Sequence, residues 1–268
     1  MLALGLASGC PGLSAERIGL TDWDFHRGSL EDPQTADWRA VRLPHDWSVE
    51  EVPVAEAPSG GGGGYFPTGE GWYRYRLEAL PEWKDQRIRL HFEGVFRNAT
   101  IWLNGQRIAF DPSGYFPFRV RLDGKLETGE ENEILVHVDN RPQPHSRWYT
   151  GSGLYRPVWL EIAPRVHLIP ESQHFITVDL KDAAARVLAG VEIHNADGKR
   201  RELSCILRLV DPASGETVAR EVVDGAIEAG GRFAVKADWR IPAPRLWDPQ
   251  QPHLYRLLVE TREKGRIL

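Results

Sequence analysis

The residues with the clearest capacity for chemistry stand side by side at positions 145–149, in the order His-Ser-Arg-Trp-Tyr. A sugar presents apolar C–H faces and a ring of hydroxyl groups, so its binding site pairs aromatic side chains with polar groups that hydrogen-bond in fixed directions. Ser146, Arg147, Trp148 and Tyr149 are therefore candidate contacts for carbohydrate. The alternative is that Trp148 and Tyr149 pack against a neighbouring domain, because aromatic side chains serve packing more often than ligand contact.

A second candidate is the segment Leu-Pro-His-Asp-Trp at positions 43–47. Asp46 could accept hydrogen bonds from sugar hydroxyls, and His45 could donate to them. In the alternative, Pro44 turns the chain, Asp46 holds a loop backbone and Trp47 enters the core, and these residue types favour that interpretation. Asp46 is thus a candidate substrate contact with a strong structural alternative.

Five consecutive glycines at positions 60–64 form the one low-complexity segment of the chain. A phosphate-binding loop would follow a strand and open a helix, whereas Tyr65, Phe66 and Pro67 follow these glycines. We expect a mobile loop here. Its neighbouring aromatic residues place it either at the rim of a sugar site or in a plain flexible connection.

Motifs of other enzyme classes do not occur in the sequence, which contains no G-x-S-x-G, no H-E-x-x-H and no C-x-x-C. Its nine histidines are scattered. His91 and His137 fall on the polar faces of expected strands and could meet across a sandwich, although solvated surface is the default for such residues. We predict no obligatory metal ion and no cofactor.

The composition is that of a folded chain of more than one unit. With 268 residues, 41% hydrophobic content and 10 Trp, the chain can fill a core and slightly exceeds the usual length of one domain. Its net charge of -5 creates no basic field, so neither nucleic acid nor an anionic lipid surface is expected as a partner. Charged residues interrupt every apolar segment before the length of about 18 residues that a membrane span needs.

Residues 1–15 contain a short apolar run ahead of small residues. This is compatible with the remnant of a secretory or lipoprotein signal in which Cys10 would carry the lipid, but the basic n-region is lacking and the run is short. The alternative is a wrongly assigned start codon, so a periplasmic or extracellular location and a cytoplasmic one both stay open. Cys10 and Cys205 fall in segments expected in different units, so no disulfide is expected.

Apolar and polar residues alternate along much of the chain, which is the pattern of half-buried β-strands. In residues 87–93, for example, Ile88, Leu90 and Phe92 alternate with charged residues and a histidine. Dipeptides such as Asn104-Gly105 supply the positive φ angles that tight hairpins need. No amphipathic helix of useful length is expected.

Many short strands with Gly and Pro at the turns predict an all-β fold with two sandwiches. We expect a jelly-roll sandwich over residues 16–168 and an immunoglobulin-like sandwich over residues 171–263, with the boundary near Pro170. Residues 264–268 would begin a link to a further domain. Strands of the second sandwich are expected at residues 174–180, 187–194, 202–210, 232–241 and 254–261.

Five segments carry a resemblance to the amino-terminal half of family 2 glycoside hydrolases of the β-galactosidase type. They are VDNRPQPHSRWYTGSGLYRPVWL (138–160), LPHDW (43–47), GWYRYRLEAL (71–80), EGVFRNATIWLNGQ (93–106) and LWDPQQPHLY (246–255). The resemblance covers nearly the whole chain and implies a galactose-binding-like jelly roll followed by an immunoglobulin-like sandwich. It also implies a catalytic TIM barrel, for which this chain has no βα repeat.

The resemblance further implies a role for the loop that contains Trp148. In family 2 enzymes this loop reaches towards the barrel and helps close the subsite for the terminal sugar. The best-known β-galactosidases and β-glucuronidases have a sugar-contacting aspartate where this chain has Arg147. The form SRWYTGSGLYR resembles another branch, commonly described as β-galactosidases, and the substitution leaves the sugar open.

A retaining glycosidase needs two carboxyl groups about 5 Å apart, and family 2 enzymes carry them as glutamates of the barrel, the acid/base one preceded by asparagine. Asn132-Glu133 is the only Asn-Glu dipeptide of this chain. It lies where an acidic turn enters an expected strand, so we predict that it is not catalytic. The chain by itself is expected to be inactive.

Three functions follow as hypotheses from the sequence. The chain is the non-catalytic part of a β-galactosidase that shapes the sugar-site entrance and braces a barrel, or a stand-alone carbohydrate-binding module, or a scaffold without ligand. Its last residues, REKGRIL, follow the last expected strand and favour the first hypothesis. If a barrel partner exists, an apolar patch is expected around Trp148 and Tyr149, and a homo-oligomer is compatible with the sequence.

Overall fold

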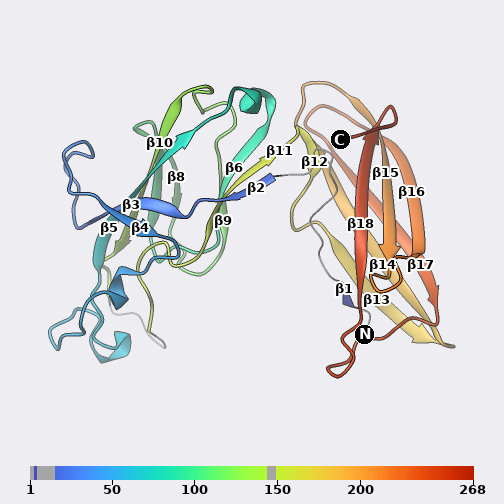
Figure 1. Ribbon diagram of the computed structural model, residues 1–268, viewed down its shortest axis with the longest axis horizontal. Helices are drawn as coiled ribbons and strands as arrows, with labels where there is room; N and C mark the ends of the chain where they lie inside the picture. Colours follow the sequence, from blue (N-terminus) through green and yellow to red (C-terminus); the bar gives the residue numbers. More distant parts are fainter. Residues whose placement is uncertain (1–2, 5–15, 144–148) are drawn as a thin grey trace. The chain divides into compact units, whose positions relative to one another are not determined.

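The computed structural model describes residues 3–4, 16–143 and 149–268 (Figure 1). These residues form β-strands and three short 3-10 helices, and they contain no α-helix. The described residues divide into two compact units, one of residues 16–162 and one of residues 163–268 together with residues 3–4. The predicted all-β fold is therefore confirmed.

The larger layer of the first unit is a six-stranded sheet whose neighbouring strands run antiparallel (Figure 1). Its strands, in spatial order, are β4 (Arg39–Arg42), β3 (Asp22–Arg27), β5 (Gly69–Glu78), β10 (Glu131–Asn140), β7 (Ala99–Leu103) and β8 (Gln106–Asp111). Strand β10 lies between β5 and β7, so the sheet is joined by long connections as well as by hairpins. This arrangement is typical of a jelly roll.

The second layer of the first unit is a four-stranded sheet. Its strands, in spatial order, are β2 (Glu16–Gly19), β11 (Val158–Ala163), β6 (Arg87–Phe92) and β9 (Phe118–Arg121). Burial of one strand face explains the alternation of apolar and polar residues in the sequence. On β6, the apolar residues Ile88, Leu90 and Phe92 are buried in the core between the two sheets. Tyr73 on β5 and Trp47, which begins a 3-10 helix between β4 and β5, fill the same core.

One hairpin of the six-stranded sheet follows directly from its turn residues. Asn104 and Gly105 connect β7 to β8, with φ angles of 48° and 76°. Positive φ at two successive residues is the requirement of a type I′ turn, and Asn-Gly is the pair that meets it at the lowest steric cost. The predicted hairpin is present.

The second unit is also a pair of sheets. One contains β1 (Ala3–Leu4), β18 (Leu254–Glu263), β15 (Arg201–Val210) and β16 (Thr217–Ile227), with β19 (Arg266–Ile267) paired to β18. The other contains β12 (Val166–Leu168), β14 (Ala184–Asn195) and β13 (His174–Lys181), with β17 (Arg232–Pro242) paired to β14. Buried residues of both sheets, including Val187, Leu207 and Trp239, form its core.

Strand β16 was not predicted from the sequence, and the relative position of two histidines was predicted wrongly. Strand β16 carries the apolar Val222 on its exposed side, at 38% exposure. Its apolar residues are therefore not confined to one face, and the alternating pattern of a half-buried strand is lost. His91 and His137 were expected to be able to meet across the first sandwich, which is wrong. His91 alternates with core residues of β6 and His137 with core residues of β10, so the two imidazoles lie on the outward faces of opposite sheets.

Candidate functional site

The candidate site lies where two long connections of the first unit meet. One runs between β4 and β5, and the other runs between β10 and β11. The backbone amide of His45 donates to the carbonyl of Leu154 at 2.9 Å, and the amide of Trp47 donates to the carbonyl of Ser152 at 3.1 Å. These bonds hold the two connections side by side.

Asp46 stabilises this junction through hydrogen bonds to both connections. It caps the 3-10 helix η1 (Trp47–Val49), and its Oδ1 accepts hydrogen bonds from the backbone amides of Ser48 at 2.9 Å and Ser152 at 2.8 Å. Its Oδ2 lies so near Gly151 that a Cβ atom there would approach it to 2.3 Å. The described contacts of Asp46 are thus with the protein backbone, and a contact of Asp46 with sugar stays a prediction.

A buried hydrogen-bond chain continues from this junction into the sandwich. The Oγ of Ser152 accepts from the Oγ of Ser48 and from the Nδ2 of Asn140, each at 2.7 Å. All three residues are at most 2% exposed. Because a buried polar group without a partner costs free energy, this satisfied chain fixes the positions of the loops that end at it.

His45 is a buried residue of the same junction between the two connections. Its Nδ1 lies 2.7 Å from the hydroxyl of Tyr73, and its Nε2 lies 3.0 Å from Oε1 of Glu50. Burial is the main reason why the pKa of His45 falls below its usual 6.5, against the opposing effect of Glu50. A neutral imidazole with its proton on Nε2 satisfies both contacts, since Nε2–H donates to Glu50 and Nδ1 accepts from Tyr73.

Of the predicted sugar contacts at positions 146–149, Tyr149 is the one whose surroundings the structure describes. It is 67% exposed, and its ring centroid lies 6.4 Å from that of Phe66. A Cβ atom on Gly64, which has φ of 66°, would lie 3.2 Å from the Tyr149 ring. The glycine segment is therefore adjacent to this tyrosine, and it forms the 3-10 helix η2 (Gly61–Gly63).

Apolar side chains surround this edge. Val54 is 50% exposed and Tyr65 is 45% exposed, and the amide of Val54 donates to the carbonyl of Tyr65 at 3.2 Å. With Phe66 and Tyr149 they form what we term the loop-end patch. Exposed clusters of this kind mark contact surfaces more often than isolated apolar residues do.

Three of the predicted contacts, Ser146, Arg147 and Trp148, lie outside the described residues. Their proposed sugar contacts stay predictions. Cys10 also lies outside the described residues, whereas Cys205 is a buried free thiol whose pKa burial raises to about 11.

The Asn132-Glu133 dipeptide has a structural explanation. Asn132 is fully buried, and its side chain binds the backbone of Glu127 and Glu130 and the side chain of Asn104. The amide of Glu133 donates to Oδ1 of Asn104 at 2.8 Å. This pair therefore organises a turn.

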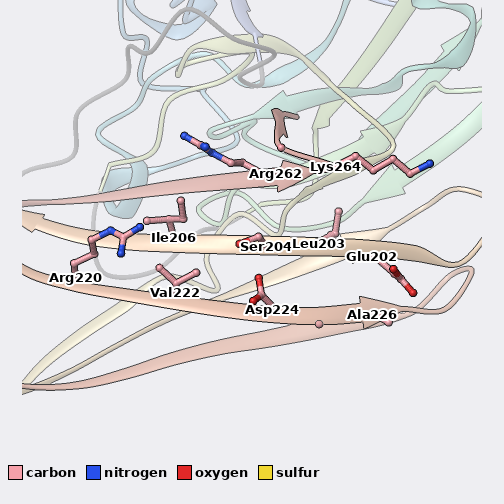
Figure 2. A pocket seen from close by; sticks show the side chains of 12 residues that line it. Glu202, Leu203, Ser204, Ile206, Arg220, Val222, Asp224, Ala226, Arg262 and Lys264 are labelled. Carbon is pink, nitrogen blue, oxygen red and sulfur yellow. The ribbon is translucent and has the colours of Figure 1, made fainter.

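The second unit has a shallow pocket on the outward face of β15, β16 and β18 (Figure 2). Its volume is about 710 Å³. Arg262 and Lys264 lie along one side of it, Asp224 on β16 lies along the other, and Glu202 is on β15 between them (Figure 2). Among the described residues that line it none is aromatic, so the pocket offers no ring face to a sugar.

In residues 3–4, 16–143 and 149–268, no group of three or more His, Cys, Asp or Glu side chains is arranged to hold a metal ion. The same part of the chain has no helix with the length and apolar character of a membrane span.

Two matches to family models cover most of the chain. Residues 64–164 match the model described as "Glycosyl hydrolases family 2, sugar binding domain", and residues 168–268 match the model described as "Glycosyl hydrolases family 2". The chain belongs to glycosyl hydrolase family 2. The resemblance stated from the sequence motifs is confirmed.

Relatives of this family 2 chain include enzymes of two activities. A β-galactosidase of Bacteroides ovatus is 34% identical over 89% of the chain, and a β-glucuronidase of Bacteroides fragilis is 25% identical over 91% of it. The crystal structure of a family 2 member from Bacteroides cellulosilyticus has 29% identity and a TM-score of 0.84 over 92% of the chain.

The chain matches only part of each relative. It spans 29% of the Bacteroides ovatus protein, 35% of the Bacteroides fragilis protein and 34% of the Bacteroides cellulosilyticus chain. It thus corresponds to about a third of these relatives' length.

Proposed function

We propose that this chain is the non-catalytic amino-terminal part of a family 2 glycoside hydrolase, where it shapes the sugar-site entrance and braces a catalytic barrel. The observation that carries the proposal is the loop-end patch, in which Tyr149 is 67% exposed beside Phe66. An exposed aromatic ring held on a rigid support is suited to stack on a sugar face. The remaining apolar side chains of the patch are suited to cover by another domain.

The junction between the two connections that carry the patch residues is built for precise positioning. Asp46 and Ser152 join the two connections at 2.8 Å, and the buried Ser48, Ser152 and Asn140 chain anchors that junction in the sandwich. Side chains that close a sugar subsite must be held within fractions of an ångström. A hydrogen-bonded junction at Ser152, three residues after Tyr149 in the chain, meets that need.

For the substrate class, we propose a β-galactoside. The relative with 34% identity is a β-galactosidase, whereas the β-glucuronidase of Bacteroides fragilis has 25% identity. Arg147 stands where the best-known members of both groups have aspartate, so this position favours neither substrate class.

The first test is the size of the natural polypeptide, detected in source cells with an antibody against this chain. A product of roughly 60 kDa or more would accommodate a barrel of about 250 residues and is the expected result. A product near the 30.3 kDa of this chain would contradict the proposal and would favour a stand-alone carbohydrate-binding module.

The second test separates the substrate classes. The full-length protein is expected to hydrolyse aryl β-D-galactosides faster than aryl β-D-glucuronides, and the 268-residue chain alone is expected to hydrolyse neither. A faster reaction with the glucuronide would overturn the substrate proposal. Turnover by the pure 268-residue chain would overturn the non-catalytic role.

A further inference from the structure

The outward face of the six-stranded sheet carries a row of side chains that the loop-end patch does not include. Trp72 on β5 is in register with His137 on β10, His137 with Thr100 on β7, and Thr100 with Phe110 on β8. Trp102 on β7 points to the same side, two residues along from Thr100. We term these five residues the sheet-face surface.

The rings of this surface are held in fixed positions. Trp72 stacks on His137 with ring centroids 4.4 Å apart and an interplanar angle of 26°. Its centroid lies 5.2 Å from that of Trp102. The Nε2 of His137 lies 2.9 Å from Oε2 of Glu70, which holds the imidazole in its place.

An apolar layer therefore lies outside the sandwich core. Leu135, between Arg74 and Trp102 in the register, is only 6% exposed although it is not part of the core between the two sheets. At the outer end of the row, Phe110 is 50% exposed. The surface thus offers a packed aromatic base with an accessible ring at one end.

The charges at the Trp72 end of the surface are paired, whereas at the Phe110 end the guanidinium of Arg107 lies 5.6 Å from the ring centroid. Arg141 lies 3.3 Å from Oε1 of Glu70 and 2.8 Å from Oδ2 of Asp139, and His137 contacts Glu70 as well. These groups can exchange hydrogen bonds with hydroxyls in fixed directions, and their paired charges give an acidic ligand no net attraction at this end of the surface. Aromatic faces bordered by directional polar groups are the chemistry of a neutral sugar.

We propose that the sheet-face surface binds a neutral β-glycan chain, at a place distinct from the loop-end patch. The row from Trp72 to Phe110 crosses three strand spacings, which is about 14 Å, so it fits several successive sugar rings better than a single one. The family model described as a sugar binding domain matches residues 64–164, which include all five residues of the surface. The proposal does not depend on which glycoside the full-length protein cleaves.

The test is native affinity electrophoresis of the full-length protein in gels that contain soluble β-1,4-galactan, mixed-linkage β-glucan or glucomannan. At least one of these neutral polymers should slow the protein, and polygalacturonate should not. The Phe110→Ala variant should bind about fivefold to tenfold more weakly, because one stacking contact is lost. Phe110→Trp keeps a ring and should retain binding.

Two controls locate the binding. Ile176→Ala, which removes a side chain of 52% exposure from the second unit, should bind like the wild type. Added galactose, which would occupy a terminal-sugar subsite, should leave the retardation unchanged. A melting temperature within a few degrees of the wild type for Phe110→Ala establishes that the variant is folded.

Three results would overturn the proposal: no retardation by any neutral polymer, unchanged affinity of Phe110→Ala, or loss of retardation in galactose. The last result would place the glycan at the loop-end patch. Hydrolysis of small aryl glycosides is measured in a separate experiment. A failure to bind polymers therefore leaves the proposed hydrolase role intact, and a failure to hydrolyse aryl glycosides leaves the polymer-binding proposal intact.

Discussion

The Oδ1 atom of Asp46 lies 2.8 Å from the backbone nitrogen of Ser152, a residue 106 positions further along the chain. The same oxygen accepts from the amide of Ser48. One carboxylate oxygen thus satisfies two backbone donors from two connections, so the position of Tyr149 depends on a residue remote from it in sequence.

Replacement of Asp46 by alanine should lower the free energy of unfolding by about 1–3 kcal/mol, because both amides lose their acceptor. Asp46→Asn keeps an oxygen at the same place and should lose less than about 1 kcal/mol. Urea denaturation followed by fluorescence measures both. If Asp46→Ala were as stable as the wild type, the fastening role would be wrong.

Gly153 should tolerate no side chain. Its φ is +114°, and a Cβ atom there would lie 2.2 Å from the Tyr73 hydroxyl and 2.9 Å from the carbonyl oxygen of His45. Gly153→Ala should therefore destabilise the unit by about 2–4 kcal/mol, from backbone strain together with overpacking. Gly105, with φ of +76° and nothing within 4 Å of its Cβ position, is the matched control.

Thermal melts of the two glycine variants should separate the two causes. Gly105→Ala carries only the backbone cost and should lose about 1 kcal/mol. Equal losses in both variants would mean that the close approach to Tyr73 adds nothing.

Local pattern in the sequence was sufficient to predict the fold class. Strand β6 alternates because one of its faces packs in the core, β10 does so apart from the apolar Leu135 on its outward face, and Asn104-Gly105 specifies its own hairpin. Strand β16 escaped prediction because Val222 faces outward, which weakens the alternation.

The loop-end patch and the sheet-face surface could be predicted only in part, because each brings together residues that are far apart in the sequence. The motif residues at positions 145–149 indicated sugar chemistry locally, but the contact of Phe66 with Tyr149 requires the fold to bring two connections together. The sheet-face surface depends on β10 lying between β5 and β7, which no local pattern specifies. His91 and His137 were misplaced because alternation was not combined with the assignment of strands to opposite sheets.

The carboxylate of Glu161 should make the stability of the first unit depend on pH. Burial alone would raise its pKa, but hydrogen bonds from His91 and Arg119 outweigh that effect and lower the pKa from 4.5 to about 2. Since the folded pKa is lower than the unfolded one, the stabilisation is fully present above about pH 4.5 and is lost as the pH falls towards 2.

Glu161→Gln should therefore be less stable than the wild type at pH 7 by about 2 kcal/mol, a value reduced by solvent screening at this outward face. The difference should shrink between pH 4.5 and 2. Urea denaturation at a series of pH values measures it. Glu131→Gln, at a side chain of 66% exposure, should behave like the wild type throughout. A difference independent of pH would rule out the charge network as its cause.

The role proposed for Tyr149 can be tested in the full-length protein with an aryl β-D-galactoside. Tyr149→Ala should lower kcat/KM by about fivefold to tenfold through the loss of one aromatic contact, whereas Tyr149→Phe keeps the ring and should stay within about twofold. The tyrosine is 67% exposed, so its removal should change the melting temperature little. Ile176→Ala, similar in exposure but in the second unit, should leave the kinetics unchanged. Unaltered kcat/KM in Tyr149→Ala would mean that the loop-end patch contacts no substrate and serves only to pack against another domain.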